Sequence, residues 1–499
     1  MTRTRPLATH PQTRIDLDEK GKNPMRIRLF IASVALLAAA LSLTLGGVLT
    51  GQDAASRTSS LPREATASTT LASPVLSRAA THADGASGTA AVAVAQSAPQ
   101  GAAALFEDLL TGLASGDTAA YATDLERRIE SQPDDSGLHA LLGLAYQQLA
   151  RETADPSLYS RAKRAYDRSQ QINPDDPIAA TGQASVATIR HRFVDGARLA
   201  RRALELSPNN ATAYAVLGDA LLELGRYDAA FAAIDKAAEL GPTVGTYARV
   251  ATARELVGRQ RAALSGIGLA LELARGVPEH RAWTLVEGGN IALRAGKEKK
   301  ARRMYAQALR EVPGYVHAQA AQAALAATAG DHDTAARSYR AITERLPLPA
   351  YFITLAHSLE ELGRDDEADA AFDRAAEIID AQSANGVRTE LARAELLLAR
   401  GSSPRRALSL ARKGFADAPN VEAKTTLAWA LLETGQCRRA RARASQALRL
   451  GTPNATAFAL RGLAEICLGN DRAGARWLAR AEATGGAALP AHAGLRASA

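Results

Sequence analysis

One stretch of 34 residues, 211–244, sets the pattern for most of this 499-residue chain, because nearly every segment after residue 101 can be aligned with it. In its first half, Tyr214, Leu217 and Leu221 lie three to four positions apart, the spacing of one helix face. Gly225 follows, and a glycine there can end a helix in the left-handed conformation. The first half is therefore predicted to be a helix that ends at a tight turn.

The second half predicts another helix, packed closely on the first. Ala230, Ile234 and Ala237 recur at spacings of four and three, and Pro242 stops the helix from continuing. Gly218, in the first half, has no side chain and lets a neighbouring helix approach its backbone.

Recurrence of this pattern separates a repeat from an ordinary helix bundle. The unit near residue 136 is expected to have a lengthened turn from Arg151 to Tyr159. Eleven units exceed the roughly three that a stable stack needs. They are expected to begin near residues 102, 136, 177, 211, 244, 282, 316, 349, 387, 421 and 455.

The pattern resembles the tetratricopeptide repeat, a helix-turn-helix unit of 34 residues. Leu217 and Gly218 match the family's Leu-Gly, Ala230 and Pro242 match its Ala and Pro, and Tyr214 stands where it prefers Trp. Two further consensus aromatic positions carry aliphatic residues, which keeps them apolar. The resemblance implies an all-α fold, a right-handed α-solenoid of about eleven such repeats.

Motifs for chemistry are missing from the sequence. It contains no H-E-x-x-H, no G-x-S-x-G and no P-loop, and its nine histidines are scattered singly. Its two cysteines are too few for a disulfide scaffold or a Cys-based zinc site. We therefore expect no enzyme activity, no catalytic residue, no metal and no cofactor.

The N-terminal segments predict a membrane location. Residues 1–28 carry seven Lys/Arg and three Asp/Glu and are expected to be disordered and cytoplasmic. Residues 29–50 contain no charge, and at about 1.5 Å per residue they can cross a ~30 Å hydrocarbon layer. The basic flank should stay inside, so that the repeats lie outside the cytoplasmic membrane, in what we expect to be a bacterial protein.

Two interpretations of residues 29–50 stay open: a transmembrane anchor or a signal sequence that is cleaved. Met25 could be the true start, which would leave a short basic region before the apolar segment. Against cleavage, this segment is longer than the usual ~7–15 residues, and its nearest candidate site is Ala54-Ala55-Ser56. We favour the anchor; cleavage would give a secreted protein.

The rest of the chain divides into three parts. Residues 51–100 are rich in Ala, Ser and Thr and are expected to be a disordered linker with a reach of roughly 40 Å. Residues 101–484 hold the repeats, and 485–499 form a disordered tail. Beyond residue 28, the remaining charge excess is small for so long a chain, so no nucleic-acid partner is expected.

The resemblance implies a concave groove lined by the second, fifth, ninth and twelfth residues of each unit. Such a groove should suit a protein or peptide partner. The alternative for each candidate is a surface residue with no binding role, or, for the two tryptophans, a filler of the core. The candidates are Asp219, Trp283, Asn290, His317, His357, Glu360, Glu395 and Trp429.

Some family members hold a C-terminal carboxylate with Lys and Asn at the fifth and ninth positions of one unit. Here Asn290 matches the Asn, but Val286 occupies the Lys position. That clamp is therefore expected to be absent.

Two further features have competing interpretations. Cys437 and Cys467 should be neighbours in stacked repeats, either bridged in an oxidising exterior or present as two free thiols. The sequence CRRARARAS, which starts at Cys437, is the densest basic cluster. A solvated outer face is the favoured interpretation, and a phosphate or lipid-headgroup site is the alternative.

Together these features predict a non-catalytic scaffold that binds a protein or peptide outside the cytoplasmic membrane. One alternative is a repeat-containing enzyme acting on glycans or peptides, which should show a pair of carboxylates in the groove. The other is a structural protein that assembles by self-association.

Overall fold

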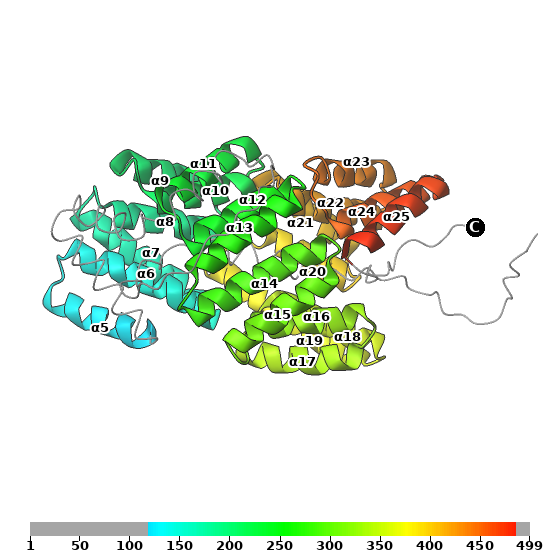
Figure 1. Ribbon diagram of the computed structural model, residues 1–499, viewed down its shortest axis with the longest axis horizontal. Helices are drawn as coiled ribbons and strands as arrows, with labels where there is room; N and C mark the ends of the chain where they lie inside the picture. Colours follow the sequence, from blue (N-terminus) through cyan, green and yellow to red (C-terminus); the bar gives the residue numbers. More distant parts are fainter. Residues whose placement is uncertain (1–117, 486–499) are drawn as a thin grey trace, which may run out of the picture.

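The computed structural model describes residues 118–485, and these form 21 α-helices and no strand (Figure 1). The predictions for residues 1–28, 29–50 and 51–100 lie outside this range, as does the tail beyond residue 485. Within the range, no helix combines the length and apolar character needed to cross a bilayer.

Ten consecutive helix pairs follow one leading helix, α5 (Thr118–Ser131). The second helix of each pair packs on the first and on the next pair, which gives the all-helical solenoid expected from the sequence. The pairs are α6 (Ser136–Thr153) and α7 (Ser157–Ile172), α8 (Pro177–Ile189) and α9 (Phe193–Leu206), α10 (Ala211–Glu223) and α11 (Tyr227–Leu240), α12 (Val244–Leu256) and α13 (Gln260–Leu273), α14 (Pro278–Arg294) and α15 (Glu298–Glu311), α16 (Val316–Thr328) and α17 (His332–Arg345), α18 (Pro349–Glu361) and α19 (Asp365–Ala384), α20 (Glu390–Ala399) and α21 (Pro404–Asp417), α22 (Val421–Glu433) and α23 (Cys437–Ala447), and α24 (Ala455–Cys467) and α25 (Asp471–Gly485).

The first helices start at or close to the predicted residues, with two differences. Helix α14 starts at Pro278 rather than near 282, because proline is favoured in the first turn of a helix, where its missing N–H costs nothing. Helix α20 starts at Glu390 rather than near 387, because α19 continues to Ala384.

The prediction of a lengthened turn from Arg151 to Tyr159 is wrong. Helix α6 continues to Thr153, and α7 already begins at Ser157. The extra residues therefore lengthen the helices. Ala154, at the C-cap, adopts a φ of 57° and makes the turn.

Small residues set the distance between paired helices. A Cβ atom on Gly218 would lie only 2.6 Å from Cγ1 of Ile234, which confirms the close approach expected there. Gly225 ends the first helix with a φ of +66°, the left-handed conformation expected from the sequence. His191 occupies the corresponding turn after α8 with a φ of 57°.

Asparagine side chains start several first helices. Asn210 accepts a hydrogen bond from the Ala213 N–H at 3.0 Å, as an N-cap does. Asn420 and Asn454 cap α22 and α24 in the same way.

Successive turns of the superhelix touch. The His191 Nδ1 atom lies 2.9 Å from the Arg388 carbonyl oxygen, and the Arg388 N–H donates to the Arg190 carbonyl at 3.1 Å. The Thr452 hydroxyl donates to the Leu256 carbonyl at 2.5 Å. Each contact joins units six helix pairs apart, so α20–α22 lie beside α8–α12 although almost 200 residues separate them (Figure 1).

Apolar contacts complete this inter-turn interface. Tyr227 and Leu256 pack against a buried cluster formed by Val421, Ala447 and Ala457. A close backbone contact lies nearby, since a Cβ atom on Gly258 would lie 2.7 Å from the carbonyl oxygen of Gly451. The superhelix is therefore a closed coil over this region.

Candidate functional site

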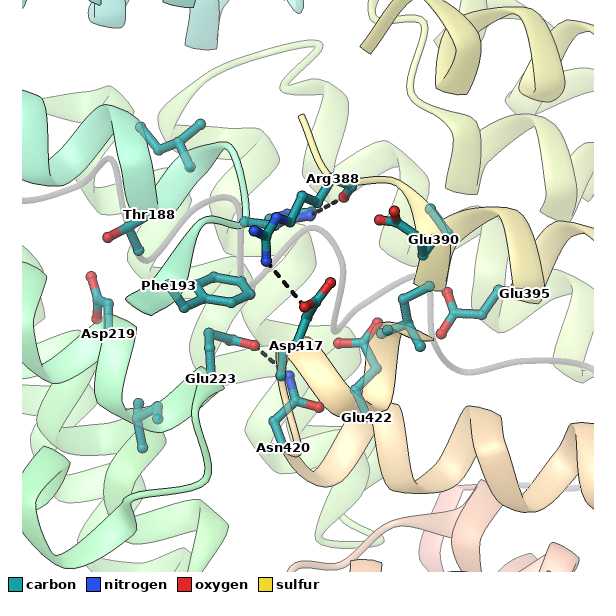
Figure 2. Close-up of a pocket in the computed structure, with 17 residues that line it drawn as sticks. Thr188, Phe193, Asp219, Glu223, Arg388, Glu390, Glu395, Asp417, Asn420 and Glu422 are labelled. Carbon is teal, nitrogen blue, oxygen red and sulfur yellow. Dashed lines mark hydrogen bonds and ion pairs between the residues drawn. The ribbon is translucent and has the colours of Figure 1, made fainter. Parts of the chain in front are cut away.

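A cavity of about 100 Å³ lies at the inter-turn interface (Figure 2). Helices α8 and α10 and the turn before α9 form one wall; helices α20–α22 and the segments that join them form the other. Its size is enough for a few water molecules but well below that of most ligand pockets. Six of its lining residues are acidic: Asp219, Glu223, Glu390, Glu395, Asp417 and Glu422.

One hydrogen bond across the cavity joins the two walls, and one ion pair lies within the second wall. The Asn420 side-chain amide, besides capping α22, donates to the Glu223 carboxyl group (Figure 2). Arg388 forms an ion pair with Asp417 at 3.2 Å, beside the His191 contact. Most of these polar contacts thus lie next to the connecting loops, at the ends of the first helices of the pairs.

Two glutamates of one wall form a carboxyl pair. Glu395 accepts a hydrogen bond from the Thr426 hydroxyl at 2.7 Å, and its carboxyl group also bonds that of Glu422. Burial raises the pKa of Glu395 to about 7, although the bonds from Thr426 and Glu422 oppose this. Burial and the neighbouring Glu395 raise the pKa of Glu422 to about 8.

Glu223, on the opposite wall, is also held protonated near neutral pH. Burial, followed by the charge of Glu422, raises its pKa to about 8 against the opposing hydrogen bond from Asn420. The cavity therefore has three carboxyl groups that can share protons at neutral pH. Within residues 118–485, however, no group of three or more His, Cys, Asp or Glu side chains is arranged to hold a metal ion.

Asp219 has a full cationic partner, which these glutamates lack, although burial still raises its pKa to about 6. The Arg249 guanidinium donates to both of its carboxylate oxygens at 2.9–3.0 Å. Both side chains are almost completely buried, with 6 % and 2 % of their surface exposed. The pair joins the neighbouring first helices α10 and α12.

Both tryptophans predicted to lie in the groove are buried. Trp283 is 7 % exposed and belongs to an apolar cluster with Tyr247 and Ala270. Trp429 is 6 % exposed, and its indole N–H donates to Glu433 at 3.1 Å. In this conformation they fill the core between helices, which was the alternative role for them.

The Asn and His candidates also bond within the chain. Asn290 accepts from the Tyr305 hydroxyl at 2.8 Å. His317 lies 2.9 Å from the Tyr351 hydroxyl, and burial lowers the pKa of its imidazole to about 4, which leaves it neutral.

His357 and the remaining acidic candidate bond each other. The His357 Nδ1 atom lies 3.0 Å from Oε2 of Glu360. Of the eight candidates, only His317 and Glu360 are half-buried rather than buried.

The structure places two of the eight candidates at the inter-turn cavity. Asp219 and Glu395 line the inter-turn cavity, whereas the other six do not. That they contact a partner stays a prediction.

Sequence reasoning missed Glu223 and Glu422. Glu422 is the second residue of its unit, an inward position by the same rule that selected Glu395, and applying the rule throughout would have found it. Glu223 carried no such signal, because its position depends on how many units complete one superhelical turn.

Cys437 and Cys467 are joined as a disulfide between the first residue of α23 and the last residue of α24. Their Cα atoms are 6.0 Å apart, within the range that a disulfide spans. The bond closes a loop across the two C-terminal helix pairs.

Models of two tetratricopeptide repeat families match parts of the chain, one over residues 187–255 and one over residues 349–381. No curated protein matches the sequence.

Several solved structures of repeat proteins are similar to this chain at low identity. A thermophilic TPR protein from Thermus thermophilus is 19 % identical over 34 % of this chain and 92 % of its own, with a TM-score of 0.31. The pilF protein of Pseudomonas aeruginosa is 19 % identical over 42 % of this chain and 92 % of its own, with a TM-score of 0.32. Yeast Tom70 is 14 % identical over 72 % of this chain and 87 % of its own, with a TM-score of 0.33.

At these identities and scores the structural likeness has no bearing on function. The family models support the resemblance seen in the sequence, because residues 187–255 and 349–381 match tetratricopeptide repeat models and lie within a solenoid of helix pairs.

Proposed function

We propose that the protein is a non-catalytic scaffold, anchored outside the cytoplasmic membrane, that binds a protein or peptide partner through its solenoid. The observation that carries the proposal is the uninterrupted series of ten stacked helix pairs, with tetratricopeptide repeat models matching two parts of it. A solenoid of this kind presents an extended surface, and a surface formed before binding lowers the entropic cost of holding an extended partner.

The membrane location rests on the sequence. Residues 29–50 are uncharged and follow a basic segment, and the linker after them would let the repeats lie clear of the bilayer. Protease protection in spheroplasts tests this part, since an outward-facing solenoid should be digested by protease added from outside.

Partner binding is tested by cross-linking and pull-down from the native membrane fraction. His317→Ala and Glu360→Ala alter the two half-buried candidates. Arg261→Ala, an exposed change on α13, is the matched control. A partner lost with the first two variants but retained with the control supports binding in the groove; recovery of no partner would refute the scaffold.

One observation favours a second candidate function, an enzyme acting on glycans or peptides. The carboxyl pair of Glu395 and Glu422 has the raised pKa values that a general acid needs near neutral pH. Against it, the cavity is too small for a sugar ring together with an attacking water molecule. Hydrolysis of glycan or peptide substrates that disappears in Glu395→Gln, with the fold intact, would favour the enzyme over the scaffold.

A further inference from the structure

The basic excess of the chain is concentrated in residues 401–485, which hold helices α21–α25. Residues 401–485 contain fourteen Lys/Arg and six Asp/Glu, whereas residues 118–400 contain 35 and 37. The whole chain has an excess of eight positive charges, so this stretch alone accounts for as large an excess.

Most acidic residues of this stretch do not face solvent. Glu422 lies in the inter-turn cavity, and Asp417 is paired with Arg388. Glu465 is only 6 % exposed and pairs with Arg461 at 2.8 Å. Asp471 and Glu482 are its only exposed acids.

The arginines, by contrast, are exposed on the second helices α21, α23 and α25, or just after α23. Within residues 118–485, nine of them form no ion pair. We name these nine the arginine face: Arg405, Arg406, Arg412, Arg438, Arg439, Arg449, Arg472, Arg476 and Arg480.

Second helices of earlier pairs neutralise many of their arginines. On α15, α17 and α19, Arg302, Arg337 and Arg374 each pair with an acid three or four residues away on the same helix. Helix α23 contains no acid at all, and the only acid of α21, Asp417, is paired with Arg388, which precedes α20. The arginines of α21 and α23 are thus left without an unpaired acid on their own helix, whereas α25 carries Asp471 and Glu482.

The three helices are the second helices of the last three pairs at the C-terminal end of the solenoid, and side-chain contacts link each to the next. The Arg443 guanidinium of α23 lies 4.6 Å from the centre of the Phe415 ring of α21. Leu448, after α23, packs in one cluster with Trp477 of α25. A flat anionic partner could therefore contact arginines of all three helices at once.

We propose that the arginine face is a docking surface for the anionic headgroups of a phospholipid bilayer. Arginine suits this role, because its guanidinium binds phosphate through two parallel hydrogen bonds and is weakly hydrated. Each basic residue near an anionic leaflet strengthens binding by about fivefold. The choice of a bilayer as the source of the phosphate groups rests on the membrane location proposed above.

A nucleic acid fits this surface less well. Single-strand binders need exposed aromatic rings on which bases stack, and within residues 401–485 no aromatic residue is exposed. Trp477 stacks on Phe458 with ring centres 5.9 Å apart, and Arg480 covers both rings.

The test labels arginines in the full chain with a dicarbonyl reagent and reads the modified peptides by mass spectrometry. The protein is mixed with vesicles of phosphatidylcholine alone, with vesicles that also contain phosphatidylglycerol, or with a single-stranded oligonucleotide. Arg259 and Arg261, exposed on or beside α13 and also without an ion pair, serve as controls within the same molecule.

The proposal is supported if vesicles protect Arg438, Arg439, Arg472 and Arg476 only when they contain phosphatidylglycerol. This protection should be lost in high salt, and Arg259 and Arg261 should stay unprotected. Equal labelling of these arginines with both kinds of vesicle overturns the proposal, whether or not residues 29–50 insert into the bilayer. Protection by the oligonucleotide alone would assign the surface to nucleic acid instead.

Flotation of two charge-matched variants completes the test. Replacing Arg438, Arg439, Arg472 and Arg476 by Gln should weaken binding to the anionic vesicles more than about 100-fold relative to neutral ones. Gln at Arg259, Arg261, Arg303 and Arg310 removes the same charge and should leave binding within a few-fold. Because none of these residues was predicted to lie in the groove, partner capture should persist in both variants, which separates this proposal from the scaffold.

Discussion

Glu223 accepts a hydrogen bond from the Asn420 side chain, although 197 residues separate them. The same asparagine caps helix α22 through its oxygen, so one side chain both starts a helix and joins two turns of the superhelix. The contribution of such contacts to the free energy of unfolding can be measured by changing one side chain at a time.

Asn420→Ala should lower the free energy of unfolding more than loss of an N-cap alone. Loss of the cap costs about 1 kcal/mol, and the buried Glu223 carboxyl group loses a partner worth about 1–3 kcal/mol. Asn454→Ala is the matched control, because Asn454 caps α24 without a contact to another turn. Urea unfolding measures both variants; equal losses would mean that the bond to Glu223 contributes nothing.

Stability should fall as pH rises from about 5 to about 8. Glu223, Glu395 and Glu422 have folded-state pKa values of about 7–8 against an ordinary value of 4.5, so the folded chain binds protons that the unfolded chain releases. Their contribution is complete below about pH 4.5 and is lost through this range, at up to about 1.4 kcal/mol per pH unit for each group.

Glu422→Gln checks this assignment, because it keeps hydrogen-bonding atoms but cannot ionise. Urea unfolding at several pH values should show a shallower fall for the variant than for the wild type. An unchanged slope would place the proton uptake elsewhere in the protein.

Gly218→Ala should destabilise the α10–α11 pair. Its new methyl group would meet Ile234 at 2.6 Å, and forced repacking of this kind costs about 1–3 kcal/mol. Gly268→Ala on α13 is the control, since no atom lies within 4 Å of its added methyl group. That substitution should stabilise the helix by about 0.5–1 kcal/mol, and thermal unfolding of both variants measures the opposite signs.

Reduction of the disulfide should lower stability by about 3–4 kcal/mol, the chain-entropy value for a loop of 30 residues. Unfolding with and without a reducing agent measures the difference, and the double variant Cys437→Ser with Cys467→Ser should match the reduced protein. Two free thiols in the protein purified without reductant would show that the bond does not form.

Periodicity within one unit predicted most of the fold. The spacing of Tyr214, Leu217 and Leu221 and the glycine after them identified helix, turn and close packing, because these depend only on neighbouring residues. The small errors arose where a proline or a longer helix shifted a boundary, as at Pro278.

The site was less accessible to sequence reasoning. The inward positions found Asp219 and Glu395, but Trp283 and Trp429 at such positions are buried in the core, because a large apolar side chain gains more from packing than from exposure. The meeting of Glu223 with Asn420 depends on the number of units per superhelical turn, which small changes in packing angle at every repeat determine together. No local pattern encodes such an accumulated angle.

Closure of the coil also bears on how the chain folds. In an open stack each repeat contacts only its neighbours, so folding can start anywhere and ends can fray independently. Here the contacts of His191 with Arg388 and of Leu256 with Thr452 couple units six helix pairs apart. Contacts so distant in sequence slow folding, but they also tie the middle of the chain to its C-terminal repeats, so these two regions should unfold in one cooperative transition rather than by fraying from one end.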